Sequence, residues 1–316
     1  MTGPRRELHG VLVVDKPADV TSAELVDEVK DRLGRNHVGH TGTLDPIATG
    51  VLPLCFGEAT KLAGLLLSDD KEYEGALTLG VETDTLDRDG AVVGERPQAA
   101  AAIDRDTLVR AMAGFLGAQE QTPPMFSAVR LDGRRLHDLA RNGRDVERAA
   151  RAIVIERFEV IAFEPPQVRF AVRCSKGTFI RSLVADLGRV LGCGAHTTSL
   201  RRTRSGLFRI DQALKRTEIN EENVFMALIA PADAVPFPRL VAVPALIGSF
   251  RNGKRMPWTE VSAQPAPDGM VSVVTPAGDL LALVWVDAGR LRYERVFTYG
   301  LTDGAVSTNL SPSRAQ

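Results

Sequence analysis

The stretch around Pro165-Pro166 constrains the fold more than any other part of the chain. Two runs rich in β-branched and apolar residues, 154–163 and 168–174, flank this proline pair and are predicted to be strands. Strands joined by so short a connection pair antiparallel, because a parallel pair needs a long crossover. Elsewhere, strand and helix patterns alternate without the regular rhythm of a parallel sheet. We therefore expect an α+β fold with a mixed, largely antiparallel sheet and peripheral helices.

The N-terminal region predicts a buried strand, a capped helix and a glycine-rich loop. Residues 10–15 form a short apolar run, and the Lys-Pro pair after it ends the strand because proline cannot donate to a ladder. Thr21 and Glu24 have the spacing of a capping box, and apolar residues follow at helical intervals. The loop from 39 to 50 contains three glycines, which allow close backbone approach.

The rest of the chain predicts a large domain followed by a small one. Four prolines between positions 231 and 244 indicate the boundary, so we expect domains at residues 1–236 and 237–316. Short β runs between glycine or proline turns predict that the second domain is a small all-β module. In the first domain, the alanine run 99–102 is expected to be a surface connection. The other expected strands are 73–81, 271–275, 280–286 and 291–297, and the other expected helices are 106–116 and 179–191.

The distribution of charge favours a nucleic-acid partner, whereas the total does not. The formal net charge is −1, which alone argues against such a partner. From 169 to 216, however, eleven Lys or Arg accompany two acidic residues, a local balance of +9, whereas 67–95 has a balance of −7. Phosphate binding depends on a local basic face. The alternative is that both stretches are solvated and that their charges mix in three dimensions.

Composition excludes several classes of protein. No apolar run approaches the roughly 20 residues that span a bilayer, and the N-terminus lacks the apolar core of a signal peptide. The cysteines are odd in number, widely spaced and without a CxxC pair, which favours reduced thiols in the cytoplasm and argues against a structural zinc. We expect neither a metal nor a cofactor. The cysteines are Cys55, Cys174 and Cys193.

Asp45 is the residue of the glycine-rich loop that is best suited to catalysis. It stands between a leucine and Pro46, whose fixed φ and missing N–H make the turn rigid and give the carboxylate a set direction. A single directed carboxylate suits nucleophilic or acid–base work on a sugar or base. Taken alone, an Asp-Pro pair more often opens a turn or a helix.

Four blocks of sequence stand out in the first two-thirds of the chain. The first is GVLVVDKPADVTS, from Gly10 to Ser22, and the second is VGHTGTLDPIATGVLP, from Val38 to Pro53, followed by GEATK. The third runs from KEYEG to TDTLDRDG, and the fourth joins CSKGTFIRSLVADLG to LGCGAH and SLRR. In this order the blocks resemble the TruB family of tRNA pseudouridine-55 synthases, and the second block is too long for chance to explain it.

The resemblance implies the pseudouridine synthase fold and the conversion of one T-loop uridine of tRNA, at position 55, to pseudouridine. This isomerisation breaks the N1–C1′ bond, rotates the uracil and joins C5 to C1′, so it needs no redox cofactor or metal. The C-terminal module resembles a small PUA-type RNA-binding domain. We expect a cytoplasmic monomer that acts on tRNA without a protein partner or a membrane. Two alternatives stay open: a synthase in a guide-RNA complex, and a non-catalytic tRNA-binding or tRNA-folding protein.

The resemblance also implies three catalytic residues. Asp45 matches the family's catalytic aspartate, whether it attacks the base, attacks the sugar or removes a sugar proton. Arg181 matches the arginine that pairs with it, and a neighbouring guanidinium favours the ionised form of a buried carboxylate. Tyr73 matches the tyrosine that stacks on the extruded base and is a candidate to take the C5 proton. Without the resemblance, Arg181 would be taken for a surface helix residue and Tyr73 for an ordinary strand residue.

Five further residues are expected from the same resemblance to bind the substrate RNA. His40 matches the residue that fills the gap left by the flipped base, the alternatives being a core histidine or a metal pair with His37, which lacks further ligands nearby. Lys16 is expected to support the site electrostatically or to contact a phosphate, the alternative being a surface lysine. Leu200 is expected to pack against the base, and Arg202 to contact phosphates. Phe179 stands where many family members have tyrosine, so it keeps the ring but lacks the hydroxyl.

Residues 124–151 correspond to the RNA-clasping insertion of the family. They contain seven arginines against four acidic residues, with apolar and aromatic residues among them. We expect this segment to be mobile without RNA and to become ordered on binding.

Overall fold

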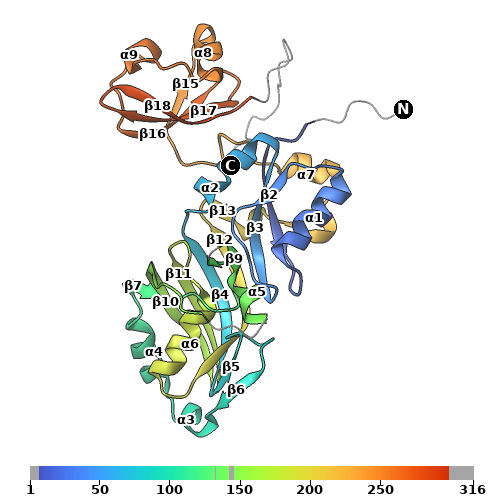
Figure 1. Cartoon of the computed structure of the whole chain (residues 1–316), viewed down its shortest axis with the longest axis vertical. Coiled ribbons are helices and arrows are strands. Elements are labelled where there is room, and N and C mark those ends of the chain that lie inside the picture. The colour runs from blue at the N-terminus through green and yellow to red at the C-terminus, as the bar shows by residue number, and fades with distance from the viewer. Residues whose placement is uncertain (1–6, 132, 142–145, 299–316) are drawn as a thin grey trace, which may run out of the picture. The chain divides into compact units, whose positions relative to one another are not determined.

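The structure is a computed structural model that describes residues 7–131, 133–141 and 146–298 (Figure 1). The chain divides into two compact units. The larger unit consists of residues 12–54 and 63–227, and the smaller unit of residues 1–11, 55–62 and 228–316. All eight residues expected to take part in catalysis or RNA binding belong to the larger unit.

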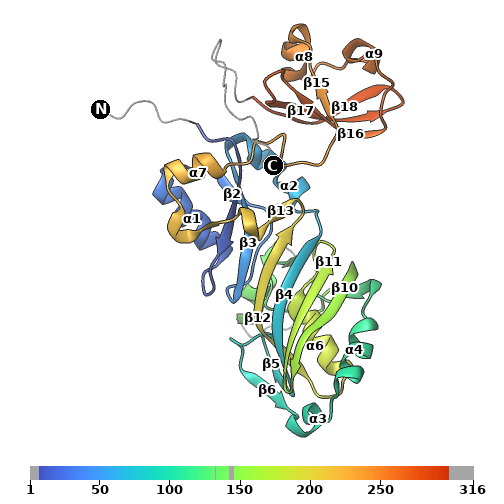
Figure 2. The ribbon, with the colours of Figure 1, turned by 180° about the vertical axis from the view of Figure 1, so that it is seen from behind.

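A ten-stranded sheet runs through the larger unit (Figure 2). In spatial order its strands are β14 (Leu214–Lys215), β1 (Gly10–Lys16), β3 (Ala48–Phe56), β12 (Ala195–Ser205), β4 (Lys71–Leu79), β11 (Gln167–Cys174), β10 (Arg151–Glu164) and β7 (Gly117–Gln121), with β2 (Val38–His40) beside β3 and β13 (Phe208–Arg209) beside β12. Pairing is antiparallel from β12 across β4, β11 and β10 to β7, and parallel between β3 and β12 and between β1 and β14. The mixed, largely antiparallel α+β fold expected from the sequence is confirmed.

The hairpin of β10 and β11 has the antiparallel pairing that the sequence predicts. Glu164 faces Gln167 across the Pro165-Pro166 turn, whose peptide bond is cis. Alternate side chains of β11 are buried and those between them are more exposed, as expected for a strand with one covered face.

β12 has no counterpart among the strands expected from the sequence, yet it lies between β3 and β4. Arginines at three of the four positions 201–204 obscure its strand pattern. Leu200 faces Ala48 on β3 and Gly75 on β4, so this register brings segments that are far apart in the sequence to the same part of the sheet.

The helices of the larger unit cover the sheet, and most agree with expectation. α1 (Ser22–Leu33) has the predicted capping box, because Thr21 and Glu24 bond each other's backbone N–H groups. α6 (Ile180–Val190) packs on β12, and α4 (Arg105–Ala113) packs on β10. α7 (Glu221–Ala227) lies beside α1, as both opposite views show.

Three shorter elements complete this part of the larger unit. They are the helix α2 (Ala63–Leu66) and the paired strands β5 (Val81–Thr83) and β6 (Val92–Glu95).

The alanine run differs from expectation, because it is helical. α3 (Pro97–Ala101) contains most of the run, and Ala100 is buried. Proline at the first helical position and alanine after it are both favourable for a helix, and the small side chain of Ala100 allows close packing. The prediction of a surface connection is therefore wrong.

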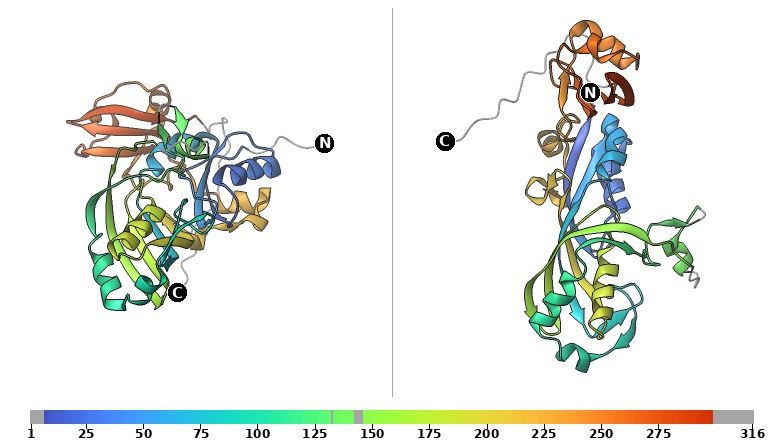
Figure 3. Two further views of the ribbon diagram at one scale, coloured as in Figure 1. Left: turned by 60° about the horizontal axis from the view of Figure 1, so that its bottom comes forward. Right: turned by 90° about the vertical axis from the view of Figure 1, so that its left-hand side faces the viewer.

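The expected RNA-clasping segment projects from the sheet (Figure 3, right). Its described residues include β8 (Arg130–Leu131), β9 (Arg134–Arg135) and α5 (Leu136–Arg141). Positions 132 and 142–145 lie outside the described residues. The mobility of the segment without RNA stays a prediction.

The smaller unit contains a four-stranded sheet with its own hydrophobic core. The strands are β15 (Arg239–Val241), β16 (Gly269–Val274), β17 (Leu280–Asp287) and β18 (Arg290–Val296), and two short helices, α8 (Ile247–Arg251) and α9 (Trp258–Val261), accompany them. Phe250 and Trp258 pack against buried side chains of β16 and β17. The three strands expected after residue 270 are all present. None of the described helices combines the length and the apolar character that a membrane crossing requires.

Candidate active site

Asp45 lies in a loop that hydrogen bonds fix on both sides. The Leu44 N–H donates to the Ser22 hydroxyl at 2.9 Å, and that hydroxyl donates to the Leu44 carbonyl at 3.1 Å. On the other side, the Asp19 N–H donates to the Pro46 carbonyl at 2.8 Å. The carboxylate between these anchored residues has a set direction, while the Asp45 side chain keeps 34% of its surface exposed. Ser22 was not anticipated, because a serine at a helix start usually indicates only capping.

Arg181, the second residue of α6, binds Asp45 with two parallel hydrogen bonds. Its Nε and Nη2 donate to Oδ2 and Oδ1 of Asp45 at 2.9 and 3.0 Å. Nη1 also donates to the Thr85 carbonyl at 2.7 Å, and Nη2 to the Phe126 carbonyl at 2.8 Å. Since the Arg181 side chain is only 4% exposed, these acceptors replace water around the guanidinium. The bidentate geometry fixes the orientation of both charged groups.

Asp87 is a second carboxylate on the same guanidinium. Its Oδ2 lies 3.2 Å from Nη1 of Arg181, and its side chain is 8% exposed. The Thr85 hydroxyl and the Asp89 N–H donate to its other oxygen at 2.6 and 3.1 Å. Asp87 was missed as a site residue, because TLDRDG has the pattern of an ordinary acidic turn. The signal that could have found it is the position of this turn within the third family-like block.

Tyr73 and Arg202 face each other on paired strands beside this ion pair. They are opposite one another in the register of β4 and β12, and both are buried. Burial raises the pKa of the Tyr73 hydroxyl, while a hydrogen bond with Arg202 acts in the opposite direction. Nε and Nη2 of Arg202 donate to the carbonyls of Val51 and Gly42 at 2.7 and 3.1 Å. Arg202 therefore ties the loop of Asp45 to the sheet. Its side chain is 1% exposed, so in this structure Arg202 acts inside the protein, and the expected contact with phosphates stays a prediction.

Lys16 is completely buried, so the surface-lysine alternative is wrong. Its Nζ donates to the carbonyls of Pro17, Val20 and Pro46 at 2.9, 2.5 and 3.3 Å. Burial lowers the pKa of Lys16 to about 8, although the negative charge of Asp45 raises it. Of its two expected roles, this position fits electrostatic support of the site, since a phosphate would have to displace backbone carbonyls.

The remaining predicted residues surround the same loop. Leu200 is 5% exposed and faces Ala48 at the start of β3. His40 ends β2, and its buried Nδ1 has no hydrogen-bond partner among the described residues. Burial and the charge of Arg202 lower the pKa of His40, so the neutral ring is favoured. Phe179 is half-buried directly before α6, two residues from Arg181.

Two family models and several relatives that match this chain carry the same activity in their names. The family model described as "TruB family pseudouridylate synthase (N terminal domain)" matches residues 30–180, and "tRNA pseudouridylate synthase B C-terminal domain" matches residues 181–235. A tRNA pseudouridine synthase B from Cupriavidus metallidurans is 42% identical over 294 residues, which are 91% of this chain and 90% of the relative. Its namesake from Burkholderia mallei is 40% identical over 302 residues, 94% of this chain and 99% of the relative.

The chain belongs to the TruB family.

Solved structures give the same fold. A chain in the crystal structure of a Cbf5-Nop10-Gar1 complex has a TM-score of 0.69 and 26% identity, with 92% of this chain and 85% of that chain covered. A chain in an H/ACA RNP bound to a substrate RNA containing 2'-deoxyuridine has a TM-score of 0.68 and 25% identity, with the same coverage of 92% and 85%. The TruB fold is thus shown by sequence and by structure, and the protein is a pseudouridine synthase by family.

The charges of this TruB protein mix more than the sequence suggests. Several arginines of the basic stretch 169–216 pair with carboxylates of the acidic stretch 67–95, and those on β11 and β12 do so because both strands are neighbours of β4. Arg204 bonds Glu72 at 2.9 Å, Arg173 lies 3.9 Å from Asp70, and Arg181 contacts Asp87. For these residues, therefore, the basic and acidic stretches mix in three dimensions and do not form a separate basic face.

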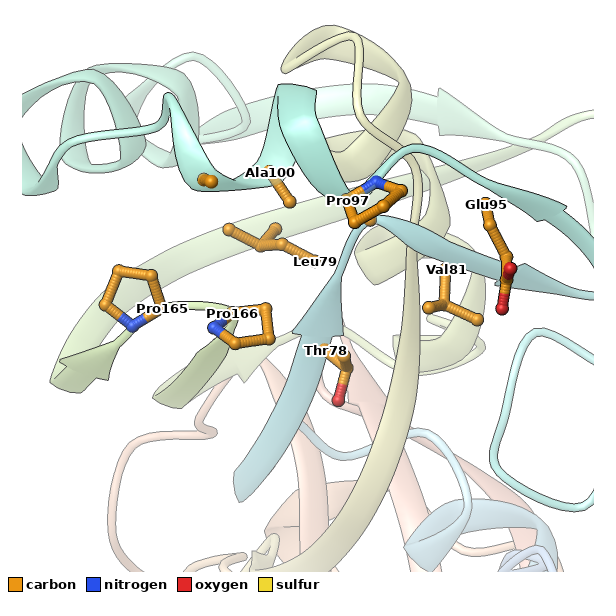
Figure 4. Close-up of a pocket in the computed structure, with 10 residues that line it drawn as sticks. Thr78, Leu79, Val81, Glu95, Pro97, Ala100, Pro165 and Pro166 are labelled. Atoms are coloured by element: carbon orange, nitrogen blue, oxygen red, sulfur yellow. The ribbon is translucent and has the colours of Figure 1, made fainter.

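A pocket of about 370 Å³ lies apart from the ion pair, where α3 approaches the β10–β11 turn (Figure 4). None of the residues that match the TruB catalytic positions lines it. Its wall is mainly apolar, with Leu79, Val81, Pro97, Ala100, Pro165 and Pro166. The candidate active site of the TruB protein is therefore the loop of Asp45, where this carboxylate is partly exposed, and not this pocket.

Proposed function

We propose that this TruB protein isomerises uridine 55 in the T-loop of tRNA to pseudouridine, with Asp45 as the catalytic carboxylate. The observation that carries the proposal is the bidentate pair of Asp45 and Arg181 at 2.9 and 3.0 Å. Asp45 is partly exposed while Arg181 is buried, so a base in the site can reach the carboxylate but not the guanidinium behind it. Substrate access and a fixed carboxylate are what the reaction needs.

The reaction exchanges one bond of the ribose for another. The N1–C1′ bond breaks, the uracil turns, C5 bonds C1′, and the proton of C5 leaves while N1 gains one. The guanidinium of Arg181 keeps the Asp45 carboxylate in a fixed direction during these steps, through its two hydrogen bonds. Tyr73 supplies the ring on which an extruded base stacks, and its buried hydroxyl stays protonated because burial raises its pKa.

The other residues form the surroundings of the flipped base. Leu200 and Phe179 provide apolar walls, and His40 fills the space that the base leaves in the RNA. Lys16 and Arg202 act from inside the protein, by donating hydrogen bonds to backbone carbonyls of the catalytic loop. Neither buried cation needs to touch the RNA for this role.

A stand-alone enzyme fits this chain better than a guide-RNA complex. Relatives named tRNA pseudouridine synthase B are 40–42% identical over nine-tenths or more of the chain, against 25–26% for the Cbf5 and H/ACA chains. We therefore assign tRNA as the substrate, a monomer without a required protein partner, and the cytoplasm as the location. The domains are a synthase domain at 1–236, with its RNA-clasping insertion at 124–151, and a PUA-like module at 237–316.

One assay tests the proposal directly. Purified protein is incubated with unmodified tRNA transcript and no guide RNA, and pseudouridine is mapped by position. Conversion at position 55 alone is the expected result. Conversion at another position would reject the T-loop assignment, and conversion that requires a guide RNA would favour the complex. Binding of tRNA without any pseudouridine would favour the non-catalytic alternative.

A further inference from the structure

The side-chain amide of Gln121 makes two hydrogen bonds with the backbone of Phe179. We call this pair of hydrogen bonds the clasp. The Phe179 N–H donates to Oε1 of Gln121 at 2.8 Å, and Nε2 of Gln121 donates to the Phe179 carbonyl at 3.0 Å. Gln121 is 4% exposed and ends β7, where it faces Arg151 of β10. Both bonds are therefore partly buried, and they start from a buried side chain at the edge of the large sheet.

This clasp acts at the start of α6, where an ordinary cap is missing. Phe179 is the N-cap residue and offers no side-chain hydrogen bond to the helix. Helix starts leave backbone N–H groups without partners, and a polar side chain at the N-cap usually satisfies one of them. Here the Gln121 amide fixes the N-cap residue itself. Arg181 follows two residues later in the first turn.

The residues that follow Gln121 contact the same turn. The Phe126 carbonyl accepts from Nη2 of Arg181 at 2.8 Å, and the Ser182 hydroxyl lies 3.5 Å from the Thr122 carbonyl. The segment 121–126, at the base of the insertion, thus contacts the N-cap and the first turn of α6 through three residues, Phe179, Arg181 and Ser182. Among these contacts only the Gln121 amide bonds a backbone group in both directions.

We infer that Gln121 is a positioning residue for the catalytic ion pair. Through the backbone of Phe179 it sets the first turn of α6, and so the alignment of Arg181 on the carboxylate of Asp45. It also fixes the ring of Phe179 against the base. This inference rests on the proposed function, because it assumes that Asp45 and Arg181 carry out the reaction.

The first test compares two glutamines of one strand. Gln121→Ala removes the clasp, and Gln119→Ala is the matched control, since the Gln119 amide bonds the Phe115 carbonyl and not α6. For Gln121→Ala we expect kcat for tRNA pseudouridine formation to fall about 10- to 100-fold with KM within about threefold, because misalignment affects the transition state. A kcat within about twofold of the control, or a parallel loss of tRNA binding, would overturn the inference.

Gln121→Glu tests the chemistry of the clasp. A carboxylate accepts from the Phe179 N–H but repels its carbonyl, whereas a protonated carboxyl group can donate to that carbonyl as the amide does. Burial raises the pKa of a carboxyl group, so protonation is within reach of mildly acidic buffer. The kcat of Gln121→Glu relative to wild type should rise as pH falls, while that ratio stays flat for Gln121→Ala. Two flat ratios would contradict the role of the second hydrogen bond.

Amide hydrogen exchange separates the clasp from the proposed function. In Gln121→Ala without RNA, exchange of the amides of residues 179–183 should become faster, with no change at α1. If the wild-type protein made no pseudouridine, the proposed function would fail, and the clasp would still be judged by this exchange. Unchanged exchange at 179–183 would refute the clasp even in an active enzyme.

Discussion

Arg181 holds both carboxylate oxygens of Asp45, although 136 positions separate the two residues in the sequence. The same guanidinium contacts Asp87, so one buried cation serves two carboxylates. Two carboxylates and one guanidinium leave the trio with a formal charge of −1. The more exposed carboxylate is Asp45, whose side chain is 34% exposed against 8% for Asp87. Asp87 and the carbonyl acceptors orient the arginine, and the arginine orients Asp45.

Asp45→Asn should abolish pseudouridine formation while tRNA affinity stays within about tenfold, or ~1.4 kcal/mol. The amide keeps the shape of the side chain but removes the negative charge that the chemistry requires. Tritium release from C5-labelled uridine in tRNA measures the activity, and filter binding measures affinity. Asp186→Asn, an aspartate on α6 that pairs with Arg189 at the surface, is the matched control. Turnover by Asp45→Asn would remove Asp45 from the mechanism.

Arg181→Met should cost stability as well as activity, because Asp87 is left buried without its cation. Loss of one partner of a buried pair costs on the order of 3 kcal/mol. Adding Asp87→Asn should recover most of that loss without recovering activity. Urea denaturation and pseudouridine formation give the two readouts. If the double variant were no more stable than Arg181→Met, the unpaired Asp87 carboxylate would not be the cause of the lost stability.

Ser22→Ala should loosen the loop of Asp45, since one hydroxyl makes both hydrogen bonds to Leu44. The cost is about 1–3 kcal/mol, because the buried N–H and carbonyl of Leu44 lose their partner. We expect kcat to fall more than KM changes, and Ser22→Thr to keep most of the activity. Thermal unfolding and steady-state kinetics with tRNA measure these effects. Equal kcat in the wild type and Ser22→Ala would contradict a role in positioning Asp45.

The buried thiols should be unreactive in the native protein. Burial raises the pKa of Cys55 and of Cys174 to about 12, so only about one such thiol in ten thousand is ionised at pH 8. A disulfide reagent should modify them slowly in the native state and rapidly in urea. Fast modification of native protein at pH 8 would contradict the burial of these two residues.

The same thiols predict a loss of stability at high pH. In the unfolded chain they ionise near pH 9, whereas in the native protein they stay protonated up to about pH 12. Between these values the native state binds more protons, so the free energy of unfolding should fall as pH rises. Urea denaturation at several pH values, with serine at both positions as control, measures the slope. A free energy of unfolding that stays constant from pH 9 to 12 would contradict this prediction.

Features that depend on neighbouring residues could be predicted from the amino-acid sequence alone. The capping box of Thr21 and Glu24, the hairpin around Pro165-Pro166 and the strands of the small module all follow from local pattern and turn chemistry. The family-like blocks also identified Asp45 and Arg181 as partners, and the structure brings them together. Their catalytic roles stay predictions until variants are measured.

Which charges are buried, and what they contact, could not be predicted without the three-dimensional fold. Lys16 and Arg202 look like surface cations in the sequence, but strand pairing puts both under the loop of Asp45. Asp87 looks like part of a turn, yet it shares the guanidinium of Arg181. The physical reason is that burial and ion pairing depend on which strands are adjacent. The central position of β12, set by its register with β3 and β4, is not a local property of its residues.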